Sequence, residues 1–395
     1  MGVANKNLGA AKKAKNDEFY TQFHDIEKEI NAYLEFSPDV FRGKTILLPC
    51  DDPYESNFFK YFALRFKDLG LKKLIATCYD GSPISNKELS LFDDELVDNK
   101  TTRTAHKLVL TDPPDFDGMK LVDLPNIKLL LSADKYHITR LHSNGDFRSD
   151  EIKALRDEAD FIITNPPFSL FREFLTWIME TDKMTLIIGN MNAITYKEVF
   201  PLIKENKMWL GNGFHAGNAY FYTPVSREYA NGVYDENTGL VKFRNCCWFT
   251  NIDHGRRHIP IPLMTMADNM RYSKHKEIKR KEYQKYDNYN AIEVPFTDAI
   301  PSDYDGAMGV PISFLDKYSP EQFEILGMCE NEDLYKLKTK VYTNEEKKNA
   351  YIAKFGKNGQ YDLNASGVII VDGKYEKVYQ RIIIRHKRNS YESNP

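Results

Sequence analysis

Cysteine is scarce in this chain and shows no paired spacing. Five cysteines occur among 395 residues, and no two of them form a Cys-x-x-Cys pair. An odd number without such spacing argues against a disulfide framework and against a zinc site made of cysteine pairs. We therefore expect reduced thiols and a cytoplasmic protein.

Long apolar runs and an excess of one charge are also missing. No segment approaches the roughly 20 apolar residues of a membrane-spanning helix, and the lysine-containing N-terminus lacks the apolar core of a secretory signal. The 54 basic and 57 acidic residues give a net charge of −3. Nucleic acid would therefore have to bind local basic patches, and we expect no membrane partner.

Short apolar runs that alternate with helical patterns indicate an α/β fold. A run of four to six apolar residues followed by an amphipathic segment is typical of βαβ units around a buried parallel sheet. Such runs lie at 44–50, 72–79, 160–168 and 185–190.

The rest of the sequence suggests how the chain is organised. Residues 1–15 are small and basic and are expected to form a flexible arm. Apolar residues from Phe19 to Tyr33 recur at helical spacing and predict a helix that begins near residue 17. A polar, proline-rich segment at about 80–145 predicts an insertion with its own strands. Asp372-Gly373 between two apolar runs predicts a hairpin turn.

The strongest chemical signal is Asn165-Pro166-Pro167-Phe168, directly after an apolar run. Ligands of open α/β sheets bind at the carboxyl ends of strands. A loop of this composition could activate an exocyclic amine such as that of adenine. This amine is a poor nucleophile because its lone pair is delocalised into the ring. The Asn165 amide oxygen and the Pro166 carbonyl would accept its two N–H groups and free that lone pair. The prolines, Pro167 included, stiffen the loop, and Phe168 would stack on a base turned out of the duplex.

The same motif has a plainer interpretation as a rigid turn, with Ser169 capping the next helix. The flanking strand and helix favour a catalytic loop. Such a loop would also serve other planar amines, namely N4 of cytosine, an RNA base or a protein glutamine. A further alternative is a DNA-binding protein that keeps the fold and has lost catalysis.

A methyl-donor site is expected at the ends of the first strands. The loop after 44–50 is acidic and suits a cationic amino group, although it lacks the glycines of a usual nucleotide loop. Asp80 would bind ribose hydroxyls, and Asp146 with Phe147 would face the donor's adenine. The predicted residues of the acidic loop are Cys50, Asp51, Asp52, Ser56 and Asn57.

Basic residues beyond position 250 are candidates for phosphate contacts. Lysines and arginines in 271–285 are more often a solvated helix face, but in a DNA-binding enzyme they would supply salt-dependent affinity. His254 and His258 have metal-like spacing without a third ligand, so we expect no metal. The candidates for DNA binding are Arg256, Arg257, Arg271, Lys274, Lys276, Lys279, Arg280 and Lys281.

Long strings of the sequence resemble the EcoRI-type adenine-specific DNA methyltransferases of bacterial restriction–modification systems. The resemblance covers nearly the whole chain and is carried by residues 15–27, 50–63, 69–79, 144–147, 164–175, 186–198 and 309–327.

The resemblance implies a Rossmann-like fold, S-adenosylmethionine as methyl donor and N6 of adenine in double-stranded DNA as acceptor. It also implies that Phe19, Tyr20 and Thr21 fold onto the methionine end of the donor. We expect a catalytic domain at 16–265 and a DNA-recognition region at 266–395. GAATTC is the first DNA site to test. We expect a monomer, and a cognate restriction endonuclease would act on the same site without forming a stable complex.

Overall fold

The chain divides into two compact units in a computed structural model. Unit 1 comprises residues 1–203 and 207–255, and unit 2 comprises 204–206 and 256–395. The division after residue 255 lies ten positions before the boundary expected at 265. The structure describes residues 19–53, 55–80, 105–112, 137–214, 217–223, 229, 232–279 and 282–387. The arm at 1–15 and much of the insertion lie outside these residues.

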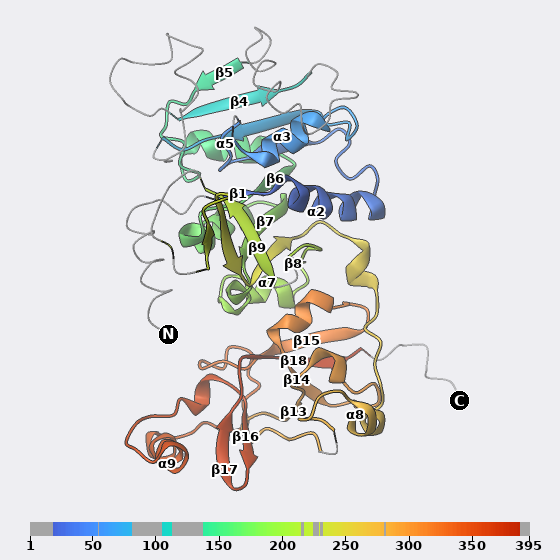
Figure 1. The fold of residues 1–395 in the computed structure, drawn as a ribbon, viewed down its shortest axis with the longest axis vertical. Coiled ribbons are helices and arrows are strands. Elements are labelled where there is room, and N and C mark those ends of the chain that lie inside the picture. The colour runs from blue at the N-terminus through green and yellow to red at the C-terminus, as the bar shows by residue number, and fades with distance from the viewer. Residues whose placement is uncertain are drawn as a thin grey trace, which may run out of the picture. The chain divides into compact units, whose positions relative to one another are not determined.

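Unit 1 is built on an eight-stranded mixed sheet (Figure 1). Its strand order is β5-β4-β3-β2-β6-β7-β12-β8, and the four central strands, β3, β2, β6 and β7, are parallel. The strands are β2 (Thr45–Leu48), β3 (Lys73–Thr77), β4 (His106–Leu110), β5 (His137–Arg140), β6 (Phe161–Thr164), β7 (Met184–Asn190), β8 (Trp209–Leu210) and β12 (Cys246–Thr250).

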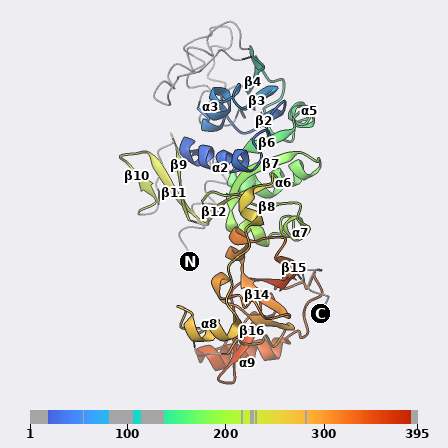
Figure 2. The ribbon, with the colours of Figure 1, turned by 90° about the vertical axis from the view of Figure 1, so that its right-hand side faces the viewer.

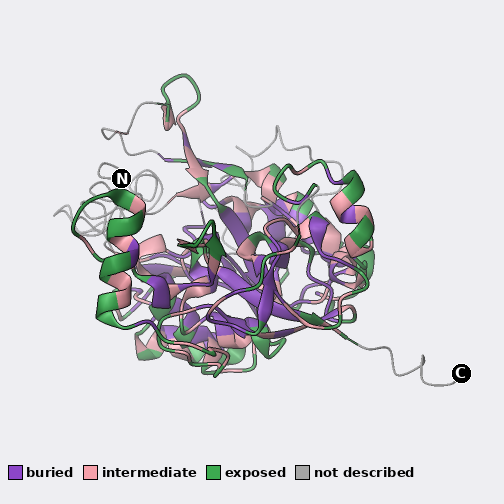
Figure 3. Ribbon diagram, turned by 90° about the horizontal axis from the view of Figure 1, so that it is seen from below, coloured by how far each residue is buried: buried purple, intermediate pink, exposed green. Residues whose placement is uncertain are grey.

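Helices cover both faces of this sheet, which is why its central strands are apolar on both sides. Figure 2 shows α2 and α3 on one face and α5 and α6 on the other. Alternate strand residues such as Ile46 and Leu74 join α2 and α3 in one apolar cluster. All four residues of β2 and all four of β6 are buried, and Figure 3 shows buried strands at the centre of the view. The helices of unit 1 are α2 (Phe23–Phe36), α3 (Asn57–Leu64), α5 (Asp150–Glu158), α6 (Phe171–Met179) and α7 (Phe200–Lys204).

The first helix begins later than the apolar spacing predicts. Phe19 precedes any regular element, and Tyr20–Thr21 form strand β1, which pairs antiparallel with β9 (Asn218–Tyr222). Strand β11 (Leu240–Arg244) and strand β10 (Tyr234–Asp235) complete a second sheet of order β1-β9-β11-β10. The predicted start near residue 17 is wrong because the start of the segment is extended and pairs with strand residues two hundred positions away.

The described strands of the predicted insertion, β4 and β5, lie at one edge of the main sheet, where β4 pairs antiparallel with β3 and β5 pairs antiparallel with β4. Two expectations about helices need correction. Ser169 lies inside a short 3-10 helix (Phe168–Leu170) and does not cap α6, whose first turn follows Leu170. After β7, a 3-10 helix (Met191–Thr195) and the short α7 replace one continuous helix.

Unit 2 contains a four-stranded sheet of order β13-β14-β18-β15 and a two-stranded hairpin. Asp372 and Gly373 both have positive φ at the tip of the hairpin, which confirms the predicted turn. A buried Arg381–Glu293 ion pair links β18 to β13. The elements are α8 (Met266–Tyr272), β13 (Ala291–Glu293), β14 (Ala307–Pro311), β15 (Phe323–Met328), α9 (Asn344–Phe355), β16 (Val368–Val371), β17 (Lys374–Lys377) and β18 (Arg381–His386).

All five cysteines are free thiols. None of the helices in the described part of the chain is long and apolar enough to cross a membrane.

Candidate active site

A pocket opens at the carboxyl ends of β2, β3 and β6. The chain leaves β2 toward β3 on one side, and β6 pairs with β2 on the other, so this is the point where strand order reverses. Open α/β sheets bind ligands at such a point. The pocket lining also includes the N-terminal segment at Phe19–Thr21 and the turn before α5.

Most residues predicted to bind the donor line this one pocket. They are Phe19, Tyr20, Thr21, Cys50, Asp51, Asp52, Ser56, Asp146, Phe147 and Asn165. Asn57 and Asp80 are not in the lining, and Tyr79 lines it beside Asp80. Of the catalytic tetrapeptide, Asn165 and Pro167 line the pocket, whereas Pro166 and Phe168 do not. Sequence reasoning missed eight lining residues: Pro49, Phe58, Cys78, Tyr79, Gly145, Arg148, Ser169 and Leu170.

Asp51 is the buried acid at the base of the pocket. Its two carboxylate oxygens accept hydrogen bonds from the Ser56 and Thr164 hydroxyls, both at 2.6 Å. Burial raises the pKa of Asp51 to about 6, and the two hydroxyls oppose that rise. Ser56 also caps α3 by accepting from the backbone N–H groups of Phe58 and Phe59.

Asp146 is held by a neighbouring cation. Arg148 donates to both of its carboxylate oxygens, at 2.8 Å and 2.6 Å, and also donates to Glu173. These contacts raise the pKa of Arg148 above its usual range. Phe147 packs edge-on against Phe174 and Trp177, which fixes it as an apolar wall of the pocket.

The N-terminal segment ties the donor loop to the catalytic loop. Asn165 Nδ2 donates to the Phe19 carbonyl at 2.8 Å, and Asn57 Nδ2 donates to the Thr21 carbonyl at 2.7 Å. Asn57 therefore positions the segment from outside the lining. The first of these bonds orients the Asn165 amide. Its oxygen, Asn165 Oδ1, is buried and has no hydrogen-bond partner among the residues that the structure describes, and neither has Thr21 Oγ1.

Comparison with known proteins identifies the family. Residues 7–387 match the family model described as adenine-specific methyltransferase EcoRI. The chain belongs to this family. It is an adenine-specific DNA methyltransferase, and the family uses S-adenosylmethionine as methyl donor.

Three curated relatives are Type II methyltransferases. M.EcoRI of Escherichia coli is 44% identical over 327 residues, covering 82% of this chain and 89% of its own. M.MpnI of Mycoplasma pneumoniae is 34% identical over 84% of this chain and 89% of its own. M.MgeORF184P of Mycoplasma genitalium is 32% identical over 97% and 99%. No solved structure matches the chain.

Phe168 of the methyltransferase stands in an aromatic cluster beside the catalytic loop. Its ring stacks on Phe19 with a centroid distance of 6.5 Å and meets Phe243 edge-on at 5.4 Å. These ring contacts hold the loop that contains Phe168 in place. The predicted contact between Phe168 and a substrate base stays a prediction.

One face of the four-stranded sheet β1-β9-β11-β10 is exposed to solvent, and the other packs against the core of unit 1. In β9, Ala219 and Phe221 are buried, whereas the alternate residues Tyr220 and Tyr222 are 44% and 41% exposed. Lys242 of β11 pairs in register with Tyr220, and Tyr222 stacks on Tyr20 of the pocket lining. An aromatic and basic surface therefore adjoins the active site.

The predicted phosphate contacts of the methyltransferase fall into four groups. The prediction that Arg257 contacts phosphate is wrong, because its side chain is buried and donates a hydrogen bond to Asn206. Arg256 is half-buried and ion-paired with Asp316 at 2.7 Å. Arg280 and Lys281 lie outside the described residues. The exposed residues are Arg271, Lys274, Lys276 and Lys279, and α8 ends at Tyr272, so most of them are not on a helix face.

Proposed function

We propose that the methyltransferase transfers the methyl group to N6 of an adenine that has been turned out of duplex DNA. The observation that carries the proposal is Asn165 Oδ1, directly after β6, which is a buried acceptor with no hydrogen-bond partner among the described residues. A buried polar atom of this kind costs free energy unless a ligand satisfies it. An N–H group of the adenine amine has the chemistry that satisfies it.

The protein acts on the amine through hydrogen bonds. The Asn165 oxygen and the Pro166 carbonyl each accept one N–H of the adenine amino group, which draws its lone pair out of the ring. Asn165 Nδ2 remains committed to the Phe19 carbonyl, so the amide cannot turn its nitrogen toward the amine. In the transfer, the bond from N6 to the methyl carbon would form as the carbon–sulfur bond of the donor breaks, and the proton that N6 loses would pass to water. Catalysis then depends on positioning, and no covalent enzyme intermediate is required.

The pocket suits S-adenosylmethionine, which supplies an electrophilic methyl group on a sulfonium. Ionised Asp51 lies in the acidic loop that would hold the cationic amino group. The Thr21 hydroxyl is a buried group without a partner in the described structure and would bind the same end of the donor. Phe147 provides an apolar wall for the adenine ring.

Duplex DNA would lie along the exposed tyrosine face of the small sheet. Tyrosine hydroxyls can donate hydrogen bonds to backbone phosphates, and Lys242 and Arg244 beside them provide charge for the same groups. The exposed lysines at 274, 276 and 279 would add salt-dependent affinity in unit 2. A monomer suffices for this chemistry, and a cognate endonuclease would meet the same DNA site without a stable complex.

The test is methyl transfer from labelled S-adenosylmethionine to duplexes with and without GAATTC, followed by nucleoside analysis. N6-methyladenine is the expected product. Asn165→Ala should lower kcat by roughly a hundredfold or more, as loss of a transition-state hydrogen bond does, with a much smaller change in donor affinity. Asn237→Ala, on an exposed turn, is the matched control. Methylated cytosine, or full activity in Asn165→Ala, would refute the proposal.

A further inference from the structure

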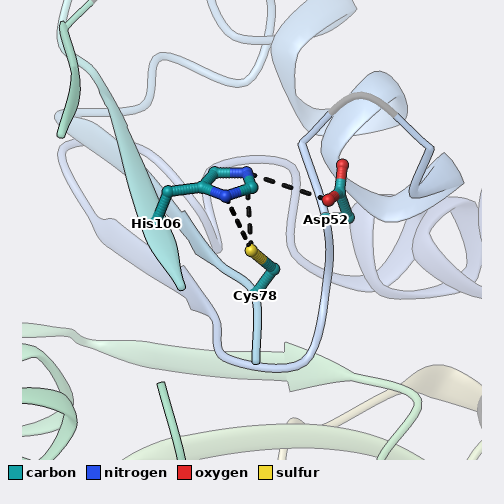
Figure 4. Close-up of side chains that lie close together, drawn as sticks. All are labelled: Asp52, Cys78 and His106. Carbon is teal, nitrogen blue, oxygen red and sulfur yellow. Dashed lines mark hydrogen bonds and ion pairs between the residues drawn. The ribbon is translucent and has the colours of Figure 1, made fainter. Parts of the chain in front are cut away.

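Three buried side chains of different chemistry meet beside the donor pocket (Figure 4). Asp52 follows β2, Cys78 follows β3, and His106 begins β4. Their exposed fractions are 6%, 3% and 2%. Cys78 Sγ lies 2.9 Å from His106 Nδ1 and 3.4 Å from Nε2, and Nε2 lies 3.8 Å from Asp52 Oδ2.

The spacing of these atoms suits a common cation. With bonds of about 2.0–2.3 Å, neighbouring ligand atoms of a tetrahedral zinc site lie roughly 3.3–3.8 Å apart. The two distances from His106 Nε2 to Cys78 Sγ and Asp52 Oδ2, 3.4 Å and 3.8 Å, fall in this range, and because Sγ lies nearer to Nδ1, at 2.9 Å, the imidazole would turn to direct its Nε2 lone pair between the other two ligand atoms. One ligand atom from each residue lies within 4.8 Å of the others.

The ligand types select the kind of metal. A thiolate with an imidazole prefers Zn²⁺ and similar thiophilic ions, whereas Mg²⁺ and Ca²⁺ prefer sites made of oxygen atoms. Three protein ligands leave one position of a tetrahedral site open. Since Asp52 and Cys78 also line the donor pocket, that open position adjoins the space that the donor would take.

We propose that Asp52, Cys78 and His106 bind one thiophilic divalent cation such as Zn²⁺, and that this cation and S-adenosylmethionine exclude each other. The cation acts here as an inhibitor of donor binding and not as a cofactor of the reaction. The second half of the proposal rests on the donor pocket assigned above. The three ligands are 26 and 28 positions apart in the sequence, at the ends of three different strands, so they form no recognisable sequence motif.

Cobalt titration of the full-length protein tests the site itself. Co²⁺ should bind one ion per chain and give the thiolate-to-cobalt charge-transfer band of a cysteine ligand. Cys78→Ser should lose this band, and His106→Ala should weaken cobalt binding at least tenfold. Cys50→Ser is the matched control, because Cys50 lines the same pocket outside the cluster, and it should keep the band. No band in the folded wild type, or an unchanged band in Cys78→Ser, would overturn the site.

A second titration tests the exclusion. S-adenosylhomocysteine added to the cobalt-loaded protein should abolish the charge-transfer band, and Zn²⁺ should raise the apparent Kd of S-adenosylhomocysteine in the wild type but not in Cys78→Ser. Binding of S-adenosylhomocysteine with an unchanged band would refute exclusion and leave the metal site standing. If S-adenosylhomocysteine fails to bind the metal-free protein, the donor pocket is wrong, and the cobalt result is unaffected.

Discussion

Thr164→Val tests the electrostatics of the donor pocket directly. The Thr164 hydroxyl donates to Asp51 Oδ2 at 2.6 Å, and both side chains are buried. Valine keeps a similar shape without the hydroxyl. A hydrogen bond to a charged group contributes about 1.5–3 kcal/mol, and one pKa unit corresponds to about 1.4 kcal/mol. Its loss should therefore raise the pKa of Asp51, about 6 in the wild type, by roughly one unit.

That rise has a pH signature in donor binding. Only ionised Asp51 attracts the cationic amino group of the donor. At pH 6, about half of the wild-type molecules but about a tenth of the variant molecules carry the charge, whereas at pH 8 nearly all of both do. The variant's Kd, divided by that of the wild type, should therefore be about five at pH 6 and near one at pH 8.

The assay is calorimetric titration with S-adenosylhomocysteine, which carries the same amino group, at both pH values. Thr185→Val is the control, because Thr185 is equally buried and its hydroxyl donates to the Lys183 carbonyl, away from Asp51. The Kd of Thr185→Val for S-adenosylhomocysteine, divided by that of the wild type, should be the same at both pH values. A ratio for Thr164→Val that is the same at pH 6 and pH 8 would refute the role given to Asp51.

The remaining predictions concern stability and DNA binding. Folding raises the pKa of Asp51 from 3.8 to about 6. The contribution of this carboxyl group to the free energy of unfolding is therefore fully present below about pH 4 and is lost as the pH rises through 6, by about 3 kcal/mol. Urea unfolding should show this loss in the wild type but not in Asp51→Asn. Glu29→Gln should destabilise the protein by about 1–3 kcal/mol, since Glu29 is fully buried and accepts from the Asn212 and Gly213 N–H groups; an unchanged denaturation midpoint would contradict this. Arg381→Ala should cost about 3–5 kcal/mol by leaving Glu293 buried without its partner, as thermal unfolding can measure. Tyr222→Ala should weaken duplex binding by about 0.5–1.5 kcal/mol, the contribution of one hydrogen bond to a phosphate, in a fluorescence anisotropy titration; equal affinity would remove the tyrosine face from the DNA surface.

The parallel core and the position of the Asn165 loop at the pocket could be predicted because their signals are local. The apolar runs that became β2, β3, β6 and β7 are buried on both faces, and the polar residues that end them fall at one edge of the sheet. Asn165 was found because its loop directly follows such a run.

The parts that failed depend on partners far along the chain. Apolar spacing could not show that Tyr20 pairs with Tyr222 in a strand, since the partner lies two hundred residues away. A basic string suggested that Arg257 faces DNA, whereas its contact with Asn206 turns the side chain inward. His106 carried no signal, because its neighbours Cys78 and Asp52 meet it only when three strands come together.

The hydrogen bonds that hold the N-terminal segment end on main-chain carbonyls, at Phe19 and Thr21. Every amino acid has such a carbonyl, so no substitution at these two positions removes an acceptor. The hydrogen bonds between the N-terminal segment and the two loops are therefore indifferent to side-chain identity at Phe19 and Thr21, and they depend on the Asn57 and Asn165 donors and on a segment that stays attached to the chain. A single proteolytic cut near Gln22 would remove the covalent attachment of both acceptors at once, which point mutation at Phe19 and Thr21 cannot do.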